Sequence, residues 1–422
     1  MRWLATGLVL VAAAAGAAPW PEGAVLENRE SLVDRIFVLT DERRALMPAV
    51  AASKWLQGKA IADPPREAAV IAAATDRATA MGLAPTPVAD FFALQIRLAR
   101  DTQSELHERW RRDGFDAPAA PASLTAELRP RLDRLTTDLL DALYLAAPFL
   151  ADAGQTLLGE RARLRLPSGR WTESERAELI GALARIRAGA PRSIARARGA
   201  GVLRIGTPGD YAPFSLVSDG RLRGADVELA DRLATGLGLR AVFIETTWKT
   251  LMADLAADHF DIAVGGVSVT PARAAVAAFS RPTAHGGKTA VGRCRERDRL
   301  ASLDAIDQPG VRVVENPGGT NERFARTTLQ HATLRIHPDN RTVFEELRAG
   351  RADVMFTDDT EVALVTHRIP ELCRLFDAIY EPADKAFLLP AGTEWVTAVD
   401  GWLAPELERG IPARLLEAYL DR

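Results

Sequence analysis

The sequence predicts an all-α half followed by an α/β half. The chain has 422 residues, too many for one ordinary hydrophobic core, so more than one domain is expected. From about residue 31 to residue 189, apolar residues recur at helical spacing in an Ala-, Leu- and Arg-rich background with few strand signals. From Val202 onward, short β-branched runs alternate with helical patterns, which is typical of mainly parallel sheets covered by helices.

The N-terminus has the pattern of a secretory signal peptide. Residues 1–18, "MRWLATGLVLVAAAAGAA", contain one arginine, a short apolar run and small residues before Pro19. This apolar run is too short to span a bilayer. We therefore expect a protein exported to the periplasm, with no membrane segment after cleavage. The net charge of -3 and the mixed charge distribution give no electrostatic footprint for nucleic acid.

The predicted helical domain covers residues 19–190, and residues 191–200 are expected to form a linker. Its amphipathic segments lie at residues 31–56, 66–82, 86–110, 124–150 and 172–189. The segment after them is basic and punctuated by glycine, which indicates a connection rather than a helix of the core. The α/β domain then takes residues 201–422.

Several polar side chains of the helical half are spaced to converge. Arg43 and Lys54 are 11 residues apart, close to three helical turns, so they point to the same side. Asp63 precedes two prolines, as an N-cap would, and Arg66 and Glu67 follow in the first turn. Taken singly, each has a structural alternative, because helix arginines are usually solvated and Asp63 could be a cap alone.

Together with Trp55, the "QIR" of Gln95 to Arg97, Gln103 and the "RPRLD" that begins at Arg129, this ordered set resembles the secreted, gamma-type chorismate mutases across nearly all of the helical half. The resemblance implies a concerted rearrangement of chorismate to prephenate that needs no acid, base or cofactor, only geometry and charge. It implies carboxylate clamps, donors to the ether oxygen, a contact to the ring hydroxyl and one further substrate contact. The resemblance assigns Arg43, Arg66 and Arg129 to the carboxylate clamps. Lys54 and Gln103 would donate to the ether oxygen, Glu67 would contact the ring hydroxyl, and Asp63 would make the further substrate contact.

A Gly-Gly break in the α/β half predicts an anion site. In "VVENPGGTNERFART", residues 313–327, a buried strand leads through the break into a helix that starts near Thr320. Backbone N–H groups at such a helix start attract anions. The Lys-Ser/Thr ending of a phosphate-binding P-loop is missing, so phosphate and carboxylate both remain candidates at this point.

Three stretches resemble the periplasmic amino-acid-binding fold, in which two α/β lobes close on a ligand. They are residues 207–234, residues 259–280 and the glycine segment just described. The resemblance implies that Arg273 grips a carboxylate together with the helix start, and that Asp358 could bind an ammonium group. The ligand contacts implied in this half are Tyr211, Trp248, Ser268, Thr270, Arg273, Asn316, Gly319, Thr320, Asn321 and Asp358.

A further set of motifs resembles the cyclohexadienyl dehydratases through residues 200–420. "GDYAPF", "TTWKTLMADLA", "GGKTAV", "NPGGTNERFA", "HPDN" and "TDDTE" carry this likeness. It implies that prephenate, or arogenate, loses CO2 and the ring hydroxyl together as the ring becomes aromatic. Glu361 would protonate the departing hydroxyl, which requires a pKa raised by burial. Lys288 would hold a substrate carboxylate with Arg273. The alternative for Lys288 is a solvated hinge lysine, and the alternative for Glu361 is an ordinary carboxylate at a helix start.

Together the resemblances predict one exported, bifunctional enzyme with chorismate, prephenate and possibly arogenate as its small-molecule partners. Its products would be phenylpyruvate and, from arogenate, phenylalanine. The alternative is an amino-acid-binding protein with a helical dimerisation domain. A homo-oligomer fits either function, and the sequence does not decide between prephenate and arogenate.

The cysteine and histidine content completes the expectations. Cys294 and Cys373 are the only cysteines, and in an oxidising compartment such a pair is expected to be bridged; two unpaired buried thiols are the alternative. By the chain-entropy model the bridge would add roughly 4 kcal/mol. The six histidines show no metal-ligand spacing, so we expect no metal, and no cofactor is implied.

Overall fold

The computed structural model describes residues 23–115, 122–152 and 154–421. The predicted signal peptide lies outside this range. Among the helices in the described ranges, none combines the length and the apolar character that a membrane span requires.

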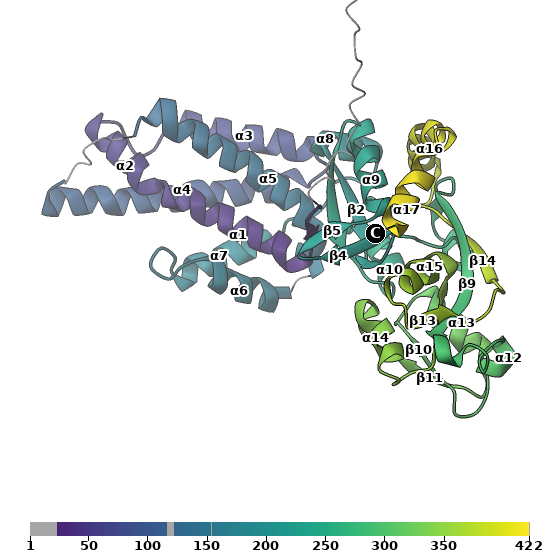
Figure 1. The fold of residues 1–422 in the computed structure, drawn as a ribbon. Coiled ribbons are helices and arrows are strands. Elements are labelled where there is room, and N and C mark those ends of the chain that lie inside the picture. Colours follow the sequence, from purple (N-terminus) through teal and green to yellow (C-terminus); the bar gives the residue numbers. More distant parts are fainter. Residues whose placement is uncertain (1–22, 116–121, 153, 422) are drawn as a thin grey trace, which may run out of the picture.

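The helical half consists of long antiparallel helices that extend away from the α/β half (Figure 1). Helix α1 packs against α5, and α4 packs against both α2 and α3. Phe37, Phe91 and Leu143 are completely buried in the resulting core. The elements up to residue 200 are β1 (Leu26–Glu27), α1 (Arg29–Ala45), α2 (Met47–Leu56), α3 (Pro64–Ala80), α4 (Pro85–Asp113), the π-helix η1 (Leu124–Leu128), α5 (Arg129–Asp152), α6 (Gly154–Arg165), α7 (Glu173–Leu183) and α8 (Ile194–Ala200).

Capping residues set the starts of these helices. Asn28 and Ser31 form a reciprocal capping box before α1, and Thr172 and Glu175 form another before α7. Asp63 accepts a hydrogen bond from the backbone N–H of Arg66 and caps α3, whose first turn holds two prolines. Each such cap stabilises its helix by about 1 kcal/mol.

The α/β half alternates strands and helices. Its strands are β2 (Val202–Thr207), β3 (Asp210–Tyr211), β4 (Ser215–Ser218), β5 (Arg221–Arg223), β6 (Arg240–Glu245), β7 (Ile262–Ala263), β8 (Ala278–Phe279), β9 (Ala284–Arg293), β10 (Arg312–Glu315), β11 (Thr333–Ile336), β12 (Val354–Asp358), β13 (Leu372–Arg374), β14 (Tyr380–Lys385) and β15 (Leu388–Leu389). Its helices are α9 (Ala225–Gly236), α10 (Leu251–Ala256), α11 (Pro271–Ala274), η2 (Cys294–Glu296), α12 (Leu303–Ile306), α13 (Thr320–Thr328), η3 (Asn340–Thr342), α14 (Val343–Arg348), α15 (Asp359–Arg368), α16 (Thr393–Glu408) and α17 (Ile411–Leu420).

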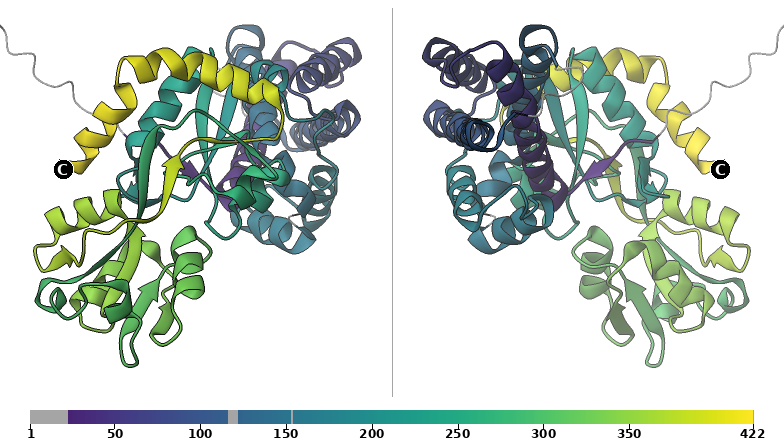
Figure 2. Two further views of the ribbon diagram at one scale, coloured as in Figure 1. Left: turned by 90° about the vertical axis from the view of Figure 1, so that its right-hand side faces the viewer. Right: turned by 90° about the vertical axis from the view of Figure 1, so that its left-hand side faces the viewer.

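These strands form two large sheets, one in each lobe. The first has the order β1-β6-β2-β7-β15-β8, and the second has the order β11-β10-β12-β9-β13, with β14 also paired to β9. The chain passes between the sheets twice, from β8 to β9 and from β14 to β15. The C-terminal helices α16 and α17 pack on α9 of the first lobe (Figure 2). Two lobes joined by two crossings create a cleft between them, as the amino-acid-binding fold requires.

A short strand ahead of the helical half belongs to the α/β sheet. Strand β1 pairs in parallel with β6, with Leu26 opposite Phe243 and Glu27 opposite Ile244. The predicted all-α domain beginning at residue 19 did not include it, because a strand of two residues carries no periodic signal. This pairing joins the beginning of the helical half to the first lobe.

The prediction that residues 191–200 form a linker is wrong, because most of this segment is the packed helix α8. Ser193 caps the helix, and Ile194, Ala197 and Ala200 are buried. Two of the basic residues that suggested a solvated connection, Arg192 and Arg196, are instead paired with backbone carbonyls and with the half-buried Asp258, whereas Arg198 is exposed.

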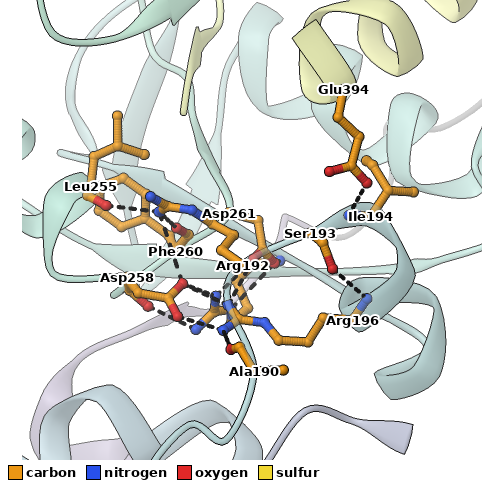
Figure 3. A network of polar contacts seen from close by, with 11 residues as sticks. Ala190, Arg192, Ser193, Ile194, Arg196, Leu255, Asp258, Phe260, Asp261 and Glu394 are labelled. Atoms are coloured by element: carbon orange, nitrogen blue, oxygen red, sulfur yellow. Dashed lines mark hydrogen bonds and ion pairs between the residues drawn. The ribbon is translucent and has the colours of Figure 1, made fainter. Parts of the chain in front are cut away.

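Figure 3 shows this junction between α8 and the first lobe. Arg192 donates to the carbonyls of Leu255 and Phe260, at 2.7 Å each. Arg196 binds both oxygens of Asp258, and the backbone N–H of Ile194 donates to Glu394.

A second buried arginine extends the junction. Arg204, on β2, binds Asp258 and the fully buried Asp261, and lies 5.3 Å from the ring centre of Tyr144 on α5. The helical half is thus anchored to the first lobe through α5 as well as α8.

Cys294 and Cys373 form a disulfide, which confirms the predicted pairing. The bridge lies in the second lobe, next to β9 and within β13. Because the helical half contains no cysteine, we expect reduction to leave unchanged the chorismate consumption that the resemblance implies for that half. The free energy of unfolding of the second lobe should fall by about 4 kcal/mol at most. Chorismate assays with and without a reductant, with thiols counted to verify reduction, check this. A parallel loss of chorismate turnover would contradict it.

Candidate active sites

A cavity of about 130 Å³ opens among five helices of the helical half. Its wall receives side chains from α1, α2, α3, α4 and α5. The structure brings together all the residues expected here, namely Arg43, Lys54, Asp63, Arg66, Glu67, Gln103 and Arg129. Residues 86 positions apart in sequence therefore face one space, as a small-molecule site requires.

The two innermost cations are held by neutral acceptors. Arg43 is buried and donates to the Thr136 hydroxyl at 2.8 Å and to the Leu132 carbonyl at 3.2 Å. Burial lowers the pKa of Arg43 to about 10, while attraction to Asp133 opposes that shift. Lys54 is half-buried and donates to the Ile61 carbonyl, and burial likewise lowers its pKa. Because neither cation is paired directly with a carboxylate, both retain charge to offer an anionic ligand.

The outer cations are positioned by carboxylates. Arg129 donates to Asp63 at 3.3 Å, and Arg66 donates to Asp133 at 2.7 Å. Glu67 accepts from the backbone N–H of Asp63 at 3.0 Å. Asp63 is therefore a helix cap and a cavity residue at once. The pairs are solvent-accessible and hence weak, so a bound carboxylate can replace either partner at little cost.

Gln103 supplies a neutral donor to the same cavity. Its Nε2 donates to the Ala99 carbonyl at 3.0 Å and approaches Met47 Sδ at 3.5 Å, and its Oε1 is buried. Arg100, which also lines the cavity and donates to Glu67, was not predicted. Its spacing of three residues from Gln103 on one helix was the available signal.

The cleft of the α/β half contains a second site. A small space of about 20 Å³ adjoins a larger one of about 400 Å³, and both are lined by Ser268, Thr320 and Asp358. Of the expected residues, the smaller space also touches Tyr211, Trp248, Arg273, Asn316, Gly319 and Asn321, and the larger one touches Thr270 and Lys288. A space of 20 Å³ holds about one water molecule, so a larger ligand requires the lobes to separate.

Asp358 at the end of β12 is the centre of the polar contacts. Lys288 donates to Oδ1 at 2.8 Å, and both Lys385 and Tyr211 donate to Oδ2. Attraction to the two lysines holds the pKa of Asp358 well below its usual range, although its burial acts in the opposite direction. Lys385 is almost fully buried and also donates to Ser268 Oγ at 2.8 Å. Lys288 is buried too, so the alternative of a solvated hinge lysine is wrong.

The glycine segment forms the other wall. Gly318 has a φ of +79°, and a side chain there would lie 2.6 Å from the backbone of Lys249. The Gly318 N–H donates to Glu322 at 2.6 Å, so it is not free to cradle a ligand. The expected cradle is therefore reduced to Gly319, Thr320 and Asn321, which line the cavity.

Arg273 faces this wall with little internal pairing. It donates to the Ser268 carbonyl at 2.9 Å. Burial lowers the pKa of Arg273 to about 10, and repulsion from Arg323 acts in the same direction. A half-buried guanidinium without a carboxylate partner is suited to bind an incoming carboxylate.

Glu361, in the first turn of α15, is 4% exposed. It accepts from the Thr357 hydroxyl at 2.5 Å, and the same hydroxyl accepts from Asn321 at 3.2 Å. Burial raises the pKa of Glu361 to about 8. The side chain lies one hydrogen-bonded step behind Asn321 and lines neither space. An ordinary solvated helix-start carboxylate would have neither this burial nor this shift.

Asp210, Asn340 and Lys385 also belong to the cleft and were not predicted. Trp248 donates to Asp210 at 2.9 Å, and burial raises the pKa of Asp210 to about 6. Asn340 lines the smaller space and donates to the Asp210 carbonyl. The motifs "GDYAPF" and "HPDN" contain Asp210 and Asn340, whereas Lys385 lies outside every motif.

Comparisons with known proteins agree with this arrangement. The model of bacterial extracellular solute-binding proteins, family 3, matches residues 203–420, and that of chorismate mutase type II matches residues 32–104. The cyclohexadienyl dehydratase of Pseudomonas aeruginosa is 43% identical over 223 residues, which are 52% of this chain and 83% of that protein. The L-cystine-binding protein of Escherichia coli is 31% identical over 159 residues, 37% of this chain and 59% of its own.

A solved structure shows the same α/β fold. It is an ancestral amino acid-binding protein described as a precursor of cyclohexadienyl dehydratase, 29% identical, with a TM-score of 0.50 over 54% of this chain and 99% of its own. The predicted fold class is thereby confirmed. Because the solute-binding match spans more than half of the sequence, the chain belongs to family 3 of the bacterial extracellular solute-binding proteins, with a type II chorismate mutase domain in its helical half.

Proposed function

We propose that this chain is an exported bifunctional enzyme that converts chorismate to prephenate and prephenate to phenylpyruvate. The observation that carries the proposal is the presence, in one chain, of a cation-lined cavity in the mutase domain and, beside the cleft, a buried Glu361 whose pKa burial raises to about 8. The dehydratase likeness at 43% identity supports an enzyme over a plain binding protein in the second half.

The mutase step uses charge and geometry alone. Arg43, Arg66 and Arg129 hold the two carboxylates of chorismate in the compact geometry that the rearrangement needs. Lys54 and Gln103 donate to the ether oxygen, which gains negative charge as its C–O bond breaks while the new C–C bond forms. No proton is transferred, so no titrating acid or base is needed.

The dehydratase step needs one proton. The bond from the ring to its carboxylate breaks and releases CO2, and the electron pair enters the ring. The C–O bond of the ring hydroxyl breaks at the far side, and Glu361 supplies the proton that makes water the leaving group. Arg273 and Lys288 hold the two carboxylates. Separation of the lobes admits the substrate, and Thr357 and Asn321 connect Glu361 to the cleft by hydrogen bonds.

We expect the mutase rate to stay nearly constant between about pH 5 and pH 8, because an amide donor such as Gln103 does not titrate. Gln103→Glu should make the rate fall as pH rises, because only a protonated carboxyl can donate. Rates of chorismate loss across this pH range check both. A steep pH dependence in the unmodified protein would remove Gln103 from its assigned role.

Separate assays of the two halves test the function. With chorismate the purified full chain should consume it, and with prephenate it should release CO2 and phenylpyruvate. A binding protein would instead leave prephenate unchanged and gain thermal stability from free amino acids. That pattern would show that the α/β half is an amino-acid-binding domain and not a dehydratase. The mutase activity would still be tested separately by chorismate consumption.

A further inference from the structure

Arg100 on α4 and Glu67 on α3 form a loose ion pair at the edge of the cavity in the helical half. Arg100 Nη1 lies 3.5 Å from Glu67 Oε2, which is longer than the roughly 2.7–3.2 Å of an ordinary N–H···O hydrogen bond. Both residues line the cavity; the Arg100 side chain is half exposed, whereas that of Glu67 is mostly covered. The pair therefore lies where the cavity meets solvent.

The two carboxylate oxygens of Glu67 have different surroundings. Oε1 accepts from the backbone N–H of Asp63 at 3.0 Å, which holds the carboxylate at the start of α3. Oε2 has the long contact to Arg100 and therefore keeps capacity to accept another bond. The cavity residues one turn away on the same two helices, Val70 and Ile96, are apolar. Of the two oxygens, Oε2 is thus better able to accept a bond from a ligand hydroxyl.

The charge balance of the cavity depends on Arg100. Within the described residues, the charged side chains that line it are Arg43, Lys54, Arg66, Arg100 and Arg129 against Asp63, Glu67 and Asp133. Two of these carboxylates accept from a guanidinium within 3.3 Å, and Arg100 is the cation that donates to the third. Two positive charges remain uncompensated, which match a ligand with two carboxylates. Without Arg100, the Glu67 carboxylate would repel such a ligand.

The charges of this pair also act inside the cavity. Burial lowers the pKa of Lys54; attraction to Asp63 and Glu67 opposes that shift, and repulsion from Arg129 and Arg100 adds to it. Glu67 and Arg100 therefore act on Lys54 in opposite directions. Their effects partly cancel only while both charges are present.

We propose that Arg100 is a further positioning residue of the mutase cavity, which neutralises Glu67 so that this carboxylate can accept the ring hydroxyl of chorismate without repelling its two carboxylates. This inference rests on the proposed mutase function. The length of the contact is part of the role, because a shorter pair would occupy Oε2 more fully. Neutralising Glu67 favours bound chorismate and the transition state alike, so the effect should appear in KM more than in kcat.

The test measures kcat and KM for chorismate in the full-length chain and its variants. Arg100→Gln should raise KM by about tenfold and leave kcat within a few-fold of normal. Arg100→Lys keeps the charge, so its KM should stay close to normal. Arg109→Gln is the matched control, because it removes the same charge from an exposed position of α4 that does not line the cavity. It should leave both constants unchanged.

Two further measurements distinguish neutralisation of Glu67 from a structural role of Arg100. In a Glu67→Gln background no carboxylate needs a cation, so adding Arg100→Gln should change KM by less than about twofold. Added salt should reduce the KM difference between the unmodified protein and Arg100→Gln, because this solvent-accessible pair is screened.

An Arg100→Gln variant with KM within about twofold of normal would overturn the inference, as would an equal rise of KM with and without the Glu67 carboxylate. A large fall in kcat at unchanged KM would also contradict it, because that result would place Arg100 at the reacting atoms. If the unmodified chain consumes no chorismate, the mutase function itself is rejected, and the inference with it.

Discussion

Glu361→Gln is expected to lower the dehydratase rate by about 10²- to 10⁴-fold while chorismate consumption continues unchanged. The substitution keeps shape and hydrogen bonding to Thr357 but removes the proton that Glu361 would transfer. Prephenate should therefore accumulate from chorismate at the rate at which the unmodified protein forms it. Following chorismate, prephenate and phenylpyruvate together in one reaction measures both steps.

The pH dependence of the unmodified protein, compared with that of Glu361→Gln, distinguishes a catalytic acid from a residue with a structural role. Burial raises the pKa of Glu361 to about 8, and in the proposed mechanism the protonated form is the active acid. If Glu361 is the acid as proposed, the kcat/KM for prephenate should be flat below about pH 7 and fall as pH rises past 8, roughly tenfold per pH unit. Glu361→Gln should abolish that fall. A variant with near-normal prephenate turnover at pH 7 would show that Glu361 is not the acid.

Lys54→Gln is expected to lower the mutase rate by about 10²- to 10³-fold, because in the proposed mechanism Lys54 is a cationic donor to the ether oxygen. Turnover of supplied prephenate should not change, since the cleft lies in the other half. Lys59→Gln is the matched control, an exposed lysine five residues later that does not line the cavity. Rates of chorismate loss and of phenylpyruvate formation from prephenate measure the two effects separately.

Two outcomes would contradict this assignment. A Lys54→Gln rate within a few-fold of normal would mean that the lysine is held by the Ile61 carbonyl for structural reasons only. A parallel loss of prephenate turnover would mean that the halves do not work independently. If that second result is seen, the junction through α8 and Arg204 is the structural connection that would couple the two halves.

Local patterns made much of the helical site predictable. Asp63 carried a recognisable capping pattern before two prolines. Arg43 and Lys54 were expected on one side of a continuous helix; the structure instead ends α1 at Ala45 and begins α2 at Met47, and the two side chains still line one cavity. Such signals are local, and the structure placed these residues around one cavity. Arg100 was missed because its position on α4 acquires meaning only when Glu67 of α3 lies opposite.

Nonlocal contacts set the limits of sequence reasoning. Strand β1 is two residues long, and its partner β6 lies more than 200 residues away. Helix α8 was taken for a linker because its arginines suggested solvent, whereas Arg196 is buried and pairs with the half-buried Asp258. Lys385 was missed for the same reason, because only the fold brings this strand residue to Asp358.

The most direct test of the central claim is a time course with chorismate as the only substrate of the purified full-length chain. The proposed function predicts that chorismate disappears, that prephenate rises and falls, and that phenylpyruvate and CO2 accumulate in equal amounts. Chorismate that stops at prephenate in the unmodified protein, with the α/β half stably folded, would contradict the claim that one chain carries both reactions.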